Sequence, residues 1–155
     1  MAARPGRGPV RPNRAEARLE GSLEFMGREW ERERGDWPER MRLALARLLT
    51  LAARNPEQTR LCTVRVFEAG QAGLERRDVW MARFTGLCDS GYAQSGRGDR
   101  PPRLISPIAA GALFELIRTH ATEDRLEQLP EALPAAVLVV LAPVVGRDAA
   151  LALTA

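Results

Sequence analysis

The chain has 155 residues, of which 45% are hydrophobic and 28% charged, the composition of a globular domain large enough to bury a core. Its formal net charge is +3, but residues 1–18 alone hold five arginines and one glutamate. The rest of the chain is therefore nearly neutral, which argues against a folded body built to bind nucleic acid. Whether the basic tail itself contacts phosphates is left open by the sequence.

Residues 1–14 are rich in Pro, Gly and Arg and predict a disordered tail, followed by one helical domain over residues 15–152. No apolar signal segment opens the chain. The longest apolar run, Leu133–Gly146, is shorter than the roughly 20 residues that a membrane span needs. These features predict a cytoplasmic protein that does not enter the membrane, in which Cys62 and Cys88 are free thiols.

Helical spacing of apolar residues runs through the chain, and no convincing alternating strand pattern occurs. The first predicted helix is amphipathic and covers Ala15–Arg34. The second begins after Asp36, a good N-cap with Glu39 three residues later, and its apolar face comprises Trp37, Met41, Ala44, Leu45, Leu48 and Ala52. Four more are expected at Pro56–Ala69, which should lie centrally, and at Leu74–Ala93, Ser106–His120 and Glu131–Val145. The fold class is all-α, a bundle of about six helices.

Signatures of catalysis are missing from the sequence. His120 is the only histidine, so a histidine-based metal cluster is impossible, and a partly buried, hydrogen-bonded role at a helix end suits it better. Glycine-rich stretches neither follow a strand nor precede a lysine, so they do not form a phosphate loop. We therefore expect no enzymatic activity, no metal and no cofactor.

The last predicted helix is apolar nearly all round from Ala135 to Ala142. A helix without a polar face must be buried on more than one side. In a chain this small, a second copy of the protein is the natural cover, so we expect a homodimer.

Three phrases of the chain resemble the C-terminal regulatory domain of the TetR/AcrR family of bacterial transcription regulators. They are GDWPERMRLALARLLTLAARNPEQTRLC from Gly35, VFEAGQAGLERRDVWMARF from Val66, and the Pro101–Gly146 run with LPEALP and LAPVVG. The resemblance implies a helical domain that binds a small hydrophobic effector and pairs through its last two long helices. The family's helix-turn-helix head should precede Leu19, where only the tail stands, so DNA contact would require a missing or partner-supplied head.

The resemblance places the effector pocket within Trp37–Ala93. Spacing alone favours a core role for the aromatic residues there, and an edge-of-core pair for Arg65 and Glu68. As pocket residues, the resemblance implies Met41, Arg65, Phe67, Glu68, Trp80, Phe84, Cys88 and Tyr92. As dimer-interface residues, it implies Leu113, Ile117, Val137, Leu141 and Val144. The alternative is a stand-alone helical module that binds a small molecule or a protein and has no link to DNA.

Overall fold

The computed structural model describes residues 30–31, 35–94 and 104–154, and every regular element in these ranges is helical. The all-α class is therefore confirmed. The predicted tail, nearly all of the predicted Ala15–Arg34 helix and residues 95–103 lie outside the described residues. In chain order, the elements are α2 (Trp37–Arg54), α3 (Pro56–Thr63), the 3₁₀ helix η1 (Arg65–Phe67), α4 (Gly70–Gln94), α5 (Ile105–Thr122), the 3₁₀ helix η2 (Leu126–Ala132), α6 (Leu133–Val145) and α7 (Arg147–Ala152).

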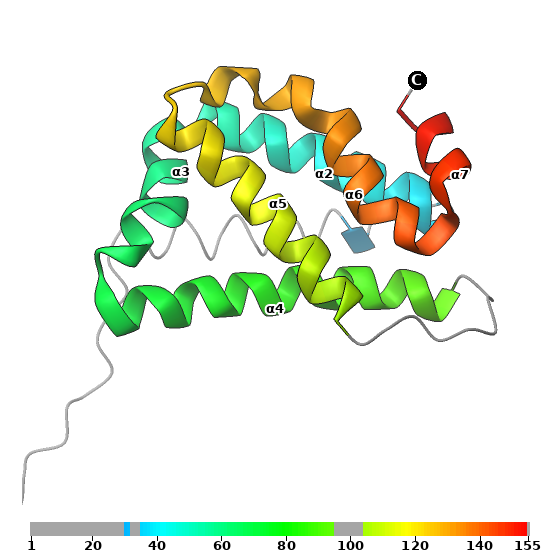
Figure 1. Cartoon of the computed structure of the whole chain (residues 1–155), viewed down its shortest axis with the longest axis horizontal. Helices are drawn as coiled ribbons and strands as arrows, with labels where there is room; N and C mark the ends of the chain where they lie inside the picture. Colours follow the sequence, from blue (N-terminus) through cyan, green and yellow to red (C-terminus); the bar gives the residue numbers. More distant parts are fainter. Residues whose placement is uncertain (1–29, 32–34, 95–103, 155) are drawn as a thin grey trace, which may run out of the picture.

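Helix α5 occupies the middle of the molecule (Figure 1). It packs against α4 on one side and against α3 and α6 on the other, while η2 and α6 pack against α2. The long helix α4 lies along one edge, and α7 packs on α6 at the far end from α3 (Figure 1). The main core lies where α2, α4, α5 and α6 meet.

Helix α2 begins as its sequence predicts. The Asp36 side chain accepts a hydrogen bond from the backbone N–H of Glu39 at 3.2 Å, and Pro38 stands in the first turn. The Glu39 carboxylate bonds to Arg42 rather than back to Asp36, so only half of a capping box forms. The predicted apolar face is buried except for Ala44, which is half-buried, and Leu49 joins it.

A close approach of two helices fixes the position of α4 against α2. Trp37 is 3% exposed, and its indole Nε1 donates to the backbone oxygen of Leu87 at 3.0 Å. Gly91 faces the same indole ring, and a Cβ atom added there would lie 2.1 Å from Trp37 Cε2. Only a residue without a side chain lets the ring lie flat against α4 at this point.

The predicted third helix is wrong in its length and in its central position. It ends at Thr63, η1 follows, and α4 begins at Gly70 rather than at Leu74. Helix α3 buries Thr59 and Thr63, whose hydroxyls donate to backbone oxygens, whereas Leu61 is exposed. Asn55 does not cap α3, because its side-chain amide donates to Leu51 O at the end of α2.

The apolar face predicted for α5 is right only in part. Of its six members, Leu113 and Ile117 are buried and Leu116 and His120 are half-buried. Ile108 is 61% exposed and Ala112 is exposed. The buried residues are Ser106, Ala109, Ala110, Leu113, Phe114, Ile117 and Ala121. Ser106 is not the N-cap, because the helix starts one residue earlier and the Ser106 hydroxyl donates instead to Asp89 Oδ1 at 2.6 Å.

The C-terminal part contains more helix than predicted, since η2 runs directly into α6 and α7 follows Gly146. The resulting helical run Leu126–Val145 has 20 residues, long and apolar enough by length and composition alone to cross a membrane. A core helix of a soluble protein passes the same test, so this is weak evidence. Five side chains of α6 lie in the core: Ala136, Val137, Val140, Leu141 and Val144.

Replacing Gly91 by Ala tests the contact between α2 and α4. The new methyl group collides with the Trp37 ring, so we expect a loss of about 1–3 kcal/mol in the free energy of unfolding. Gly86→Ala on the same helix is the matched control, because its Cβ meets nothing within 4 Å. The control should gain about 0.5–1 kcal/mol from helix propensity. Denaturant unfolding measures both, and equal effects of the two variants would contradict the packing described.

Candidate functional site

The five side chains implied as a dimer interface belong to the core of a single chain. Leu113, Ile117, Val137, Leu141 and Val144 are each at most 4% exposed. Neighbouring helices of the same chain already cover these five side chains. Within one chain, α6 is covered by α2, α5, η2 and α7.

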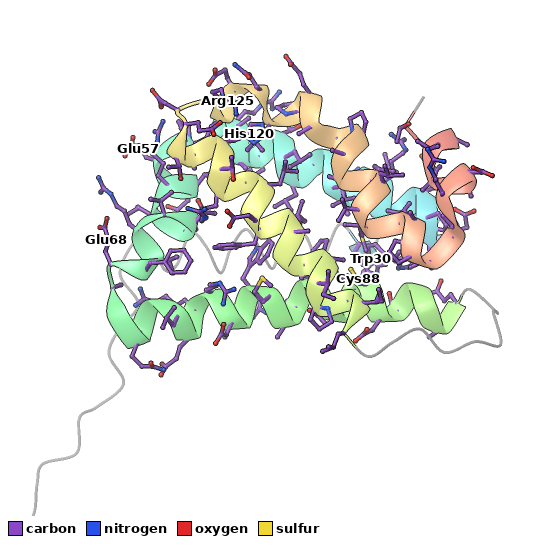
Figure 2. The ribbon with its side chains drawn as sticks, viewed as in Figure 1. Trp30, Glu57, Glu68, Cys88, His120 and Arg125 are labelled. Carbon is purple, nitrogen blue, oxygen red and sulfur yellow. The ribbon has the colours of Figure 1, made fainter. Side chains whose placement is uncertain are left out.

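Three of the implied pocket residues are core residues as well. Met41 is fully buried, Cys88 is 1% exposed and Phe84 is 3% exposed, and all three belong to the main core cluster. This agrees with the interpretation that helical spacing of apolar residues favours. Cys88, well along α4 from its first turn, lies near the start of α5 (Figure 2).

The other implied pocket residues lie elsewhere. Arg65 and Glu68 are exposed, and no ion pair joins their side chains in the described structure. Figure 2 shows Glu68 at the outer edge of the molecule, directed away from the helices. Phe67 is 47% exposed and Trp80 is half-buried. The side chain of Tyr92 lies outside the described set.

Four aromatic side chains from η1, α4 and α5 form one contiguous group, which we call the aromatic cluster: Phe67, Trp80, Phe84 and Phe114. Phe114 is its hub, with its ring centroid 6.2 Å from that of Phe67 and 5.7 Å from that of Trp80, both edge-to-face. Trp80 stacks on Phe84 at 5.8 Å with an interplanar angle of 4°. These are the favourable geometries of aromatic pairs. The cluster leads from the core at Phe84 to the surface at Phe67.

An arginine completes the aromatic cluster. The guanidinium carbon of Arg77 lies 5.4 Å from the Phe114 ring centroid, a cation–π distance. Its Nη1 pairs with Asp78 at 3.1 Å, and Asp78 is well exposed. Its Nε is buried and has no hydrogen-bond partner in the described structure. A buried donor without an acceptor costs free energy and requires an explanation.

Sequence reasoning missed Phe114 and Arg77. The spacing of Ala110, Leu113, Phe114, Ile117 and Ala121 is that of a helical stripe and marks the face that α5 buries. The predicted face through Ile108, Ala112 and Leu116 fits the same period and leaves Phe114 out. Arg77 carries no local signal, because its position beside Phe114 depends on how α4 packs on α5.

His120 and the two cysteines have structural roles. His120 is half-buried, with Nδ1 2.8 Å from Leu116 O, as predicted. Burial raises the pKa of the Cys62 thiol, and burial together with the charge of Asp89 raises the pKa of the Cys88 thiol to about 12. Neither is an activated nucleophile, since activation needs a lowered pKa. Across the described ranges, no group of three or more His, Cys, Asp or Glu side chains is placed to hold a metal.

Apolar side chains also face outward from the last two long helices. Leu104, at the start of α5, is 67% exposed, Ile108 is 61% exposed, and Val139 on α6 is 44% exposed. Ala135 and Pro143 on α6 are exposed too. These residues, rather than the five implied by the resemblance, are the ones that a second molecule is able to reach.

Comparison with protein-family models, with curated proteins and with solved structures gives no match.

Met41 and Phe67 should respond differently to truncation. Met41→Ala removes a fully buried side chain of the core and should cost about 2–5 kcal/mol in the free energy of unfolding. Phe67→Ala should cost clearly less, because almost half of that side chain is already in water. Denaturant unfolding of both variants measures the difference. If the larger loss belongs to Phe67→Ala, Met41 lines an open cavity instead of the core.

The burial of Cys88 predicts that the folded chain loses stability at high pH. Its pKa rises from 9.0 to about 12 on folding, so the folded state keeps a proton that the unfolded state releases. The thiol therefore contributes fully below about pH 9, and its contribution declines as the pH rises toward 12. Unfolding free energies at pH 8, 9.5 and 10.5 should fall in the native chain and fall less in Cys88→Ala. Identical slopes for the two proteins would contradict the burial of this thiol.

Proposed function

We propose that this chain is the effector-binding and dimerising domain of a TetR-like transcription regulator, with a small hydrophobic molecule as its effector. The observation that carries the proposal is the aromatic cluster, which extends from the core to a half-exposed Phe67 and holds an arginine with an unpartnered Nε. Apolar walls with a few directed polar groups are the usual composition of small-molecule sites.

The proposed site lies at one end of the region that the resemblance assigns to the effector. Phe67 and Trp80 remain binding residues in this proposal, and Phe114 and Arg77 join them. Phe84, stacked on Trp80, joins the site to the core, which also contains Met41 and Cys88. The 3₁₀ helix η1 is three residues long, and its last residue, Phe67, is followed by an exposed turn at Glu68 and Ala69. Movement of that ring would widen access to Phe114.

Dimerisation, in this proposal, uses the outward faces of α5 and α6. Ile108 and Val139 are exposed apolar residues on these two helices, which the resemblance implies as the pairing helices. Exposed aliphatic side chains at a contact between two copies would be removed from water when the copies associate. We assign DNA contact to a helix-turn-helix supplied by a missing segment or by a partner subunit.

The double variant Ile108→Glu, Val139→Glu tests the pairing. Because charges are costly in a desolvated apolar contact, we expect the dimer to dissociate while the helical circular dichroism stays unchanged. Sedimentation equilibrium at micromolar concentration gives the mass. Val79→Glu on α4 is the matched control, since Val79 is an exposed apolar residue (52%) on a helix outside the proposed pair. A native chain that sediments as a monomer would refute the proposed dimer.

A further inference from the structure

The edge of the Arg77 guanidinium that carries Nε lacks an acceptor. Asp78 occupies Nη1 from the neighbouring position on the same helix, and the buried Nε has no partner in the described part of the chain. Nε and the adjacent Nη2 present two parallel N–H groups, the arrangement that binds one carboxylate through two hydrogen bonds. A carboxylate, with its two oxygens, would satisfy both of these donors.

Arg40 makes the significance of Arg77 clearer by comparison. Its guanidinium lies 4.4 Å from the Trp30 ring centroid, and its Nε is also buried without a partner. Arg40 Nη2, however, donates to the backbone oxygen of Trp30. Arg40 therefore already binds a segment outside its own helix. Arg77 has only its exposed neighbour Asp78. An exposed ion pair of this kind contributes little free energy, so exchanging it for a better acceptor costs little.

The aromatic side chains around Arg77 indicate which other chemical group a ligand bound there would contain. Phe114 lies within 6.2 Å of Phe67, measured between ring centroids, and within 5.4 Å of the Arg77 guanidinium carbon. A ligand that reaches Arg77 by way of Phe67 therefore passes along aromatic faces and edges. Planar aromatic rings complement such a surface through stacked and edge-to-face contacts.

We infer that the effector is a planar aromatic molecule bearing a carboxylate, with the carboxylate bound by Arg77 and the ring held by Phe67 and Phe114. This inference rests on the proposed function, because it takes the aromatic cluster as the effector site. It adds the requirement that the effector carries a negative charge, which the aromatic cluster alone does not impose. Trp80, edge-on to Phe114, would sense the bound ring directly.

Two probes of the same shape separate the charge requirement from simple apolar binding. The full chain is titrated calorimetrically at pH 7 with 2-naphthoate and, separately, with the neutral naphthalene-2-methanol. Hydrogen bonds to charged groups are stronger than neutral ones, so we expect 2-naphthoate to bind about tenfold more tightly or better. Arg77→Gln should abolish this preference while the affinity for the neutral probe persists, and Arg77→Lys should retain part of it.

Arg40→Gln is the matched control, and its preference for 2-naphthoate should equal that of the native chain. Circular dichroism of each variant establishes that it is folded. Equal affinities of the native chain for the two probes, or a preference that survives Arg77→Gln, would overturn the inference and leave the proposed apolar site standing. If neither probe binds the native chain, the proposed effector site fails and the inference fails with it.

Discussion

The close contact of Trp37 with Gly91 is the constraint on which the rest of the structure depends. It holds the start of α2 against the last turns of α4 through a buried indole ring and a hydrogen bond to Leu87 O. With that end fixed, the 25 residues of α4 extend to the opposite end of the molecule (Figure 1). Trp80 and Arg77 are thereby carried to α5, where Phe114 receives both. The contacts of α4 with α5 and η1 then set the geometry of the aromatic cluster.

The two ends of α4 have different physical characters. Near Gly91, the chain is closely packed, and Cys88 is sealed so well that its pKa is raised to about 12. Near η1, the aromatic side chains reach the solvent and one arginine donor is left without an acceptor. Exposed aromatic surface beside an arginine suits ligand binding, because small-molecule sites combine apolar walls with a few directed polar groups.

Sequence patterns predicted the features that arise within one helix. The Asp36 cap and the apolar face of α2 are local, and both are confirmed. The hydrophobic pattern failed at positions where contacts between helices determine which side chains are buried. Thr59 and Thr63 are buried because their hydroxyls find backbone oxygens, and α5 presents Phe114 inward although Ile108 fits an equally good stripe. Of the implied pocket, Phe67 and Trp80 remain in the proposed site, whereas Arg77 depends on helix packing that spacing does not encode.

Hydrogen–deuterium exchange with and without 2-naphthoate is the most direct test of the central claim, that the effector binds at the η1 end and not within the core. The account predicts that added protection is confined to peptides covering η1, the first half of α4 and the middle of α5. Protection concentrated instead around Met41 and Cys88 would contradict it, because the ligand would then occupy the space that the structure fills with core side chains.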